Sequence, residues 1–289
     1  LLKYIFKKNM SNNIKIFLPD GSEKSLPANS TGFDLANSIG KGLAKSAVAY
    51  KVDETQYDLS DQLKDNAQVS IITIQSEEGL EIMRHTLTAQ VLARAIKNLY
   101  PKSKLAIGPT IEDGFYYDVE SEEVISSDDL IKIEDEMKNI IKTKSLLTKK
   151  LVSKSEALKI FKEKKEPFKE IIINESNQKN DFQLYYQDNE EFVDLCRGPH
   201  LPNLGFIGSF KLTKVSGAYW KGDSKNTMLT RIYGTAFNSD KDLQKHLNEV
   251  EEALKRDHRK LGREMDLFHF QDEAPGMVFW HPKGWTIYR

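Results

Sequence analysis

The chain has 289 residues, which is enough for two or more domains with ordinary hydrophobic cores. Its 42 basic and 43 acidic residues give a formal net charge of −1, so any contact with a nucleic acid must come from local patches. The single cysteine excludes an internal disulfide framework and is typical of a cytoplasmic protein. No apolar run approaches the roughly 18 residues that a membrane span needs, so we expect no membrane partner.

The first ten residues have some features of a targeting segment. Their apolar core is too short, however, and no small-residue cleavage site follows it. We interpret them as an upstream extension before a start at Met10, although a start at Leu1 remains the alternative.

Residues 13–75 predict a small mixed α/β domain. A strand is expected over residues 14–18, followed by a tight turn at Pro-Asp-Gly and a second short strand. A short helix is expected over residues 34–39, because Gly40 and Gly42 are stop signals. Two further β-rich segments, residues 47–52 and 69–74, complete a pattern that predicts a β-grasp-like fold.

Residues 78–238 predict a larger α+β domain. Apolar residues at helical spacing predict a helix over residues 86–99, and Ser153 with Glu156 forms a capping-box pattern at the start of another helix. Strands are expected over residues 206–212 and 228–233. The lysines between residues 138 and 169 alternate with glutamates, which favours a solvated helical face over a tRNA contact.

One long helix is expected over residues 239–264, with an apolar stripe and a basic end at residues 255–260. It is interpreted as a connector, with contact to an RNA backbone as the alternative. Residues 265–289 contain two of the three tryptophans and predict the beginning of a third domain.

The most informative string is Asp194-Leu-Cys-Arg-Gly-Pro-His200, which places the only cysteine four residues before a histidine in a turn. A thiol and an imidazole so placed can bind a metal, form a nucleophile–base pair, or orient a water and a substrate hydroxyl. The alternatives are a buried small cysteine and a histidine that only hydrogen-bonds a loop. Because Asp194, Arg197, Gly198 and Pro199 accompany the pair, we favour a functional pocket.

This string resembles the editing domain of bacterial threonyl-tRNA synthetases, and the resemblance extends over residues 13–289. Other strings that carry it are Leu18-Pro-Asp-Gly-Ser22, Leu105-Ala-Ile-Gly-Pro109, Asp113-Gly-Phe-Tyr-Tyr-Asp118, Ala218-Tyr-Trp-Lys-Gly-Asp-Ser224 and Arg231-Ile-Tyr-Gly-Thr-Ala236. Alanyl-tRNA synthetases share only a looser histidine-and-cysteine pattern. The resemblance implies a ubiquitin-like (TGS) domain at 13–75, an editing domain at 78–238, a connector helix at 239–264 and the start of a class II catalytic domain at 265–289.

The resemblance also implies a chemistry. Serine lacks one methyl group of threonine, and such a difference supplies only about 1–3 kcal/mol of discrimination. The family therefore hydrolyses mischarged seryl-tRNA in a second pocket. By resemblance the residues of that pocket here are His85, Lys169, Asp194, Cys196 and His200.

One residue of the family's pattern is missing. The editing-site helix normally carries a His-x-x-x-His pair, but counting forward from His85 leads to Ala89, and counting back from residues 95–101 leads to Gln90. Alanine cannot transfer a proton and glutamine does not titrate near neutral pH. Because loss of such a group typically costs about 10²–10⁴-fold in rate, we predict a folded pocket that hydrolyses seryl-tRNA poorly or not at all.

For a full-length relative the resemblance implies tRNA(Thr), L-threonine and ATP as partners, Mg²⁺ and Zn²⁺ as cofactors, and a homodimer. No cofactor is expected within these residues, which should not aminoacylate alone. A metal, if bound, would use His85, Cys196 and His200, one ligand fewer than structural zinc takes. The alternatives are a stand-alone trans-editing deacylase and a non-catalytic tRNA-binding module.

Overall fold

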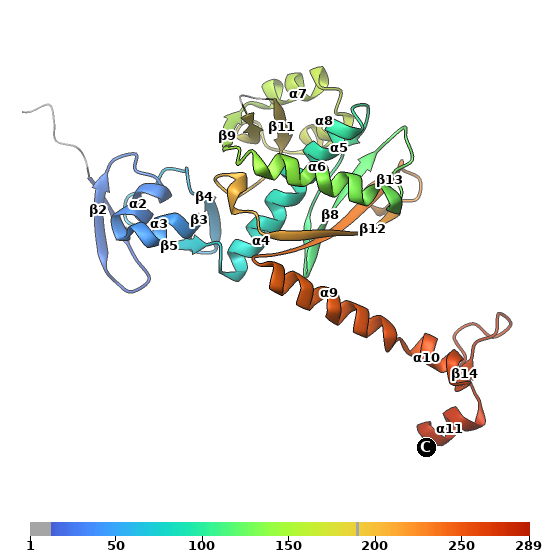
Figure 1. Ribbon diagram of the computed structural model, residues 1–289. Helices are drawn as coiled ribbons and strands as arrows, with labels where there is room; N and C mark the ends of the chain where they lie inside the picture. The colour runs from blue at the N-terminus through green and yellow to red at the C-terminus, as the bar shows by residue number, and fades with distance from the viewer. Residues whose placement is uncertain (1–12, 189–190) are drawn as a thin grey trace, which may run out of the picture. The chain divides into compact units, whose positions relative to one another are not determined.

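The computed structural model describes residues 13–188 and 191–289, which form two compact units divided between Asn238 and Ser239 (Figure 1). The interpretation of Leu1–Met10 as an extension falls outside the described residues. Both units combine helices and strands, so the expected α+β class is confirmed. No helix in the described part of the chain is long and apolar enough to cross a membrane.

The first domain is built on a five-stranded sheet in the order β2-β1-β5-β3-β4. Its strands are β1 (Asn13–Phe17), β2 (Glu23–Pro27), β3 (Ala47–Val52), β4 (Thr55–Asp58) and β5 (Ala67–Thr73). Strands β1 and β5 run parallel while the other pairs are antiparallel, and α2 (Gly32–Ile39) and α3 (Lys41–Ser46) lie between β2 and β3 in the chain. This is the expected β-grasp arrangement, with α2 starting at a Thr31–Asp34 capping box.

A broken helix runs through the core of the second domain. It consists of α4 (Glu77–Thr86), the π-helix η1 (Leu87–Leu92) and α5 (Ala93–Leu99). In η1 the Ala93 N–H donates to the Thr88 carbonyl five residues back, the bond that defines a π turn. A π turn accommodates one residue more than an α turn. The π turn therefore accounts for the one-residue difference between counting forward from His85 and counting back from residues 95–101.

Two sheets accompany this helix. The larger has the order β12-β13-β8-β6, with β7 paired to β8, and the smaller has the order β11-β10-β9. The strands are β6 (Lys104–Leu105), β7 (Thr110–Ile111), β8 (Gly114–Glu120), β9 (Leu147–Val152), β10 (Phe182–Gln187), β11 (Phe192–Leu195), β12 (Ser209–Tyr219) and β13 (Met228–Phe237). The helices are α6 (Leu130–Lys142), α7 (Lys154–Glu163) and α8 (Pro167–Glu175), with short 3₁₀ turns η2 (Ser127–Asp129), η4 (Leu204–Phe206) and η5 (Trp220–Gly222).

The two domains of the first unit share one hydrophobic core. The largest buried cluster combines Val48, Ala49 and Ile72 from the β-grasp sheet with Met83 and Leu87 from the broken helix. A smaller cluster around Ile16 and Leu35 belongs to the β-grasp domain alone. Burial at the shared cluster therefore stabilises both domains.

The second unit contains α9 (Asp240–Lys255), α10 (His258–Glu264), β14 (Phe268–His269), β15 (Phe279–Trp280) and α11 (Pro282–Tyr288). The single helix expected over 239–264 is thus two helices. The break occurs because the Asp257 carboxylate accepts a hydrogen bond from the Arg259 N–H, which starts a new helix.

Candidate functional site

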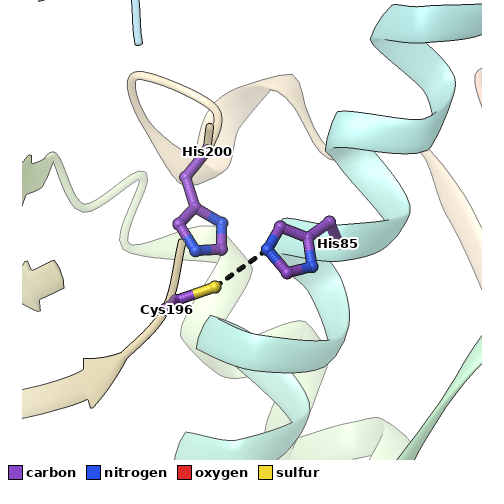
Figure 2. Close-up of side chains that lie close together, drawn as sticks. All are labelled: His85, Cys196 and His200. Carbon is purple, nitrogen blue, oxygen red and sulfur yellow. Dashed lines mark hydrogen bonds between the residues drawn. The ribbon is translucent and has the colours of Figure 1, made fainter. Parts of the chain in front are cut away.

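Three side chains that are far apart in the sequence meet beside the broken helix. His85 lies in the last turn of α4, whereas Cys196 and His200 lie on the loop that follows β11. Figure 2 shows the two rings and the thiol turned toward one another. The His85 Nε2 and Cys196 Sγ atoms are 2.9 Å apart, and the two imidazole rings stack with centroids separated by 4.6 Å.

A hydrogen-bond network fixes the tautomer of His200. The Thr86 hydroxyl donates its only proton to the Ile82 carbonyl at 2.8 Å and accepts the Leu201 N–H at 3.0 Å. Because His200 Nδ1 lies 3.1 Å from the same oxygen, Nδ1 must carry the proton that bridges them. In the neutral form of this buried ring Nε2 is then the unprotonated nitrogen, and no described residue pairs with it.

A buried ion pair lies next to this cluster. Lys169 Nζ on α8 is 2.6 Å from Asp194 Oδ1 on β11, and both side chains are almost fully buried. The Asp194 carboxylate also accepts the Leu195 N–H at 2.8 Å and the Tyr117 hydroxyl at 3.4 Å. Lys169 completes the triangle by donating to the Tyr117 oxygen at 3.3 Å.

Burial and neighbouring charge tune these groups. Burial raises the pKa of Asp194, and Lys169 opposes that rise. Burial lowers the pKa of His85, so this imidazole is neutral near pH 7 and lies within hydrogen-bonding distance of the Cys196 sulfur. The charge of Asp194 opposes this lowering, so the ion pair lies close enough to the histidine–cysteine cluster to act on it.

No second histidine accompanies His85 in the broken helix. Ala89 and Gln90 are both buried in η1. Gln187 Nε2 on β10 donates to the Gln90 carbonyl at 2.8 Å and to its side-chain oxygen at 3.0 Å. Gln90 is therefore engaged with the smaller sheet, and its amide nitrogen has no hydrogen-bond partner among the described residues.

Three site residues were not predicted from the sequence: Thr86, Tyr117 and Tyr185. Tyr117 lies in a string that carries the resemblance, so that string is the signal that could have found it. Tyr185 lies directly opposite Asp194 in the β10–β11 register, and its ring meets the His200 ring edge-on at 4.4 Å. Neither this pairing nor the Thr86 contact has a sequence signal.

The three cluster atoms could also hold a metal ion. One ligand atom each from His85, Cys196 and His200 lies within 4.8 Å of the others, and the free Nε2 of His200 is a suitable donor. Three nitrogen or sulfur ligands match a catalytic zinc site with an open position, whereas a structural site takes four. The same residues can work without a metal by accepting a proton from water.

The two domains match known families. Residues 14–73 match the TGS domain, and residues 183–233 match the threonyl and alanyl tRNA synthetase second additional domain. These matches and the fold define the class: a β-grasp domain joined to a domain of the kind that threonyl and alanyl tRNA synthetases carry.

The similar proteins within this class are threonine–tRNA ligases. The chain is 51% identical over 281 residues to a threonine–tRNA ligase of Bartonella tribocorum, and 51% identical over 281 residues to that of Brucella canis. It is 49% identical over 274 residues to that of Prochlorococcus marinus strain MIT 9211. These alignments cover 95–97% of this chain and 42% of each relative. The chain is thus similar to threonine–tRNA ligases along nearly its whole length, and it spans less than half of theirs.

Proposed function

We propose that this chain is the N-terminal portion of a threonine–tRNA ligase, that it binds tRNA(Thr), and that its second domain carries the site for hydrolysis of seryl-tRNA(Thr). The observation that supports this most is the meeting of His85, Cys196 and His200 beside the Lys169–Asp194 pair. In the whole enzyme the reaction would be aminoacylation of tRNA(Thr) with L-threonine and ATP. The same proposal includes Mg²⁺, Zn²⁺, a homodimer and a cytoplasmic location.

We divide the domains as the sequence predicts. Residues 13–75 are the TGS domain, 78–238 the editing domain, 239–264 the connector and 265–289 the start of a class II catalytic domain. The division of the structure between Asn238 and Ser239 and the two family matches support this.

The chemistry assigned to the site is ester hydrolysis. The lone pair of His200 Nε2 accepts a proton from the attacking water, whose oxygen adds to the carbonyl carbon of the seryl ester. The bond from that carbon to the ribose oxygen then breaks, and His200 returns the proton to the leaving ribose oxygen, so that free serine and uncharged tRNA result. Cys196 and His85, which contact each other, line the side of the pocket where that water would lie. Lys169 and Asp194 position the substrate side of the pocket.

We further propose that hydrolysis is slow in this chain. The position of the second helix histidine is occupied by Ala89 or Gln90, and Gln90 is tied to Gln187. The pocket keeps its fold because the other five residues are in place, but one group that could transfer a proton or hold the water is missing.

Binding and hydrolysis can be tested separately. We expect an adenosine carrying serine through a non-hydrolysable amide at its 3′ position to bind this chain, and the threonyl analogue to bind more weakly because of its extra methyl group. Calorimetric titration measures both, with His200→Ala as the matched variant that weakens seryl binding. Equal affinity for the two analogues, or none for either, would contradict the assignment. Binding without hydrolysis of seryl-tRNA, even after deletion of Ala89 together with Gln90→His, would instead indicate a non-catalytic tRNA-binding module.

A further inference from the structure

A residue of the β-grasp domain reaches the loop that carries His200. Asp58 is the last residue of β4 and is 7% exposed, which is unusual for a carboxylate. It is separated from His200 by 142 positions in the chain. A buried carboxylate at a domain boundary needs partners, and Asp58 finds them in the second domain.

Its partners surround the His200 loop. Oδ1 accepts the backbone N–H of His200 at 2.9 Å. Oδ2 accepts the Tyr185 hydroxyl at 2.7 Å and lies 2.8 Å from Lys149 Nζ on β9. The carboxylate therefore joins the loop to two strands of the smaller sheet, and charge-assisted bonds of this kind are shorter and stronger than neutral ones.

Tyr185 also contacts the loop that carries His200. Its ring meets the His200 ring edge-on, and its hydroxyl occupies the space next to Gly198, where a Cβ atom would lie 1.9 Å from that oxygen. Asp58 holds the hydroxyl in this place. The loop is thus held by Asp58 at the His200 backbone, by Tyr185 beneath Gly198, and by Thr86 at the His200 ring.

We propose that Asp58 is a positioning residue for the hydrolytic site, through which the β-grasp domain orients His200 toward Cys196 and His85. The inference rests on the proposed deacylase function. Asp58 contacts the backbone of His200 and leaves Nε2 untouched, so it acts through His200. The site can therefore hydrolyse its substrate efficiently only when the β-grasp domain is packed against the loop that carries His200.

Three variants separate positioning from general docking. Asp58→Ala removes all three contacts. Asp58→Asn keeps an oxygen for the His200 N–H, and Lys149 retains Asp61 as an ionic partner. Lys51→Met removes a different ion pair between the two domains, Lys51 with Glu78 at 2.6 Å, which does not involve the His200 loop.

The first readout does not depend on activity. In the full chain we would measure amide hydrogen exchange at His200 and the nitrogen resonances of its imidazole. We expect Asp58→Ala to accelerate exchange at His200 at least about tenfold and to shift the imidazole signals, because the N–H loses its acceptor. Asp58→Asn should leave exchange at His200 near the wild-type value because it keeps the acceptor, and Lys51→Met should leave both readouts near the wild-type values.

The second readout is hydrolysis of seryl-tRNA(Thr) under single turnover, with tRNA affinity measured in parallel. We expect Asp58→Ala to lower the rate constant by about 10- to 10²-fold at unchanged affinity, because small displacements of a reacting group are costly. If hydrolysis by the wild type is too slow to measure, the Asp58 and Lys51 substitutions are compared in a parent chain that carries Gln90→His with Ala89 deleted.

The outcomes are distinct. Unchanged exchange, imidazole signals and rate in Asp58→Ala would overturn the inference, as would an equal loss of all three in Lys51→Met. Absence of hydrolysis in every variant would contradict the proposed function. The exchange and imidazole data would still decide whether Asp58 positions His200.

Discussion

At the scale of single residues, the site depends on charges that are buried together. Lys169 and Asp194 are 4% and 2% exposed at their side chains, and their separation of 2.6 Å offsets the loss of water around both. Removal of either group alone leaves the other buried without its ionic partner.

Lys169→Met should therefore lower the free energy of unfolding by about 3–5 kcal/mol, because Asp194 is left as an uncompensated buried charge. The double variant with Asp194→Leu should regain much of this loss. Urea denaturation measures both. Lys104→Met is the control, since it breaks a surface pair with Glu120 that is worth about 0–1 kcal/mol. A loss in Lys169→Met no larger than in the control would contradict the role of the pair.

The partly buried His85 predicts a pH dependence of stability. Burial lowers the pKa of His85 below its ordinary value of 6.5, so below about pH 6.5 the unfolded chain takes up a proton that the folded protein does not. The contribution of His85 to stability is complete above that pH and is lost as the pH falls toward the folded-state pKa. His85→Gln should remove this part of the acid decline.

Unfolding curves between about pH 5 and 8 test this, and His258→Gln, at a site whose side chain is 80% exposed, is the control. An acid decline that His85→Gln leaves unchanged would contradict the burial of a neutral His85.

At the scale of elements, the loop between β11 and η4 decides the geometry of the site. Gly198 has φ of +63°, and the Tyr185 hydroxyl occupies the space that a side chain would need. Any residue other than glycine would move the loop that carries both Cys196 and His200.

Gly198→Ala should destabilise the protein by about 1–3 kcal/mol, because alanine is strained at the positive φ of this position and its methyl group would collide with the Tyr185 hydroxyl. Combining it with Tyr185→Phe should recover part of the loss, which a double-mutant cycle measures. Gly40→Ala is the control, since Gly40 has extended backbone and no atom near its Cβ position. If Gly198→Ala is as mild as Gly40→Ala, the loop is not held by Tyr185.

The sequence predicts some of these elements better than others. The proximity of Cys196 and His200 follows from a short string, and the one-residue mismatch between His85 and residues 95–101 becomes the π-helix η1. Asp58 could not be predicted, since strand spacing says nothing about a contact between domains. The break at Asp257 was missed because the apolar stripe outweighed a helix-starting residue.

At the scale of the whole molecule, the two domains of residues 13–238 share a core as well as a site. Ile72 of the β-grasp sheet is 2% exposed and belongs to the same buried cluster as Met83 and Leu87. Cooperative unfolding of both domains is expected when one apolar cluster spans them.

Ile72→Ala should lower stability by about 2–5 kcal/mol and should do so in both domains at once. Hydrogen exchange resolved by segment measures this. Leu35→Ala, in the cluster that belongs to the β-grasp domain alone, is the comparison for a change farther from the shared core. Faster exchange after Ile72→Ala that is confined to residues 13–75 would show that the domains unfold independently.

We propose that the absence of one histidine slows hydrolysis in a pocket that is otherwise folded. Deletion of Ala89 together with Gln90→His removes the extra residue of η1 and places a histidine four positions after His85. Hydrolysis of serine-charged tRNA(Thr) is the most direct measurement, with the deletion alone and Gln90→His alone as controls. We predict slow hydrolysis by the unaltered chain and an increase of about 10²–10⁴-fold in the combined variant. Fast hydrolysis by the unaltered chain, with no gain in the combined variant, would contradict it.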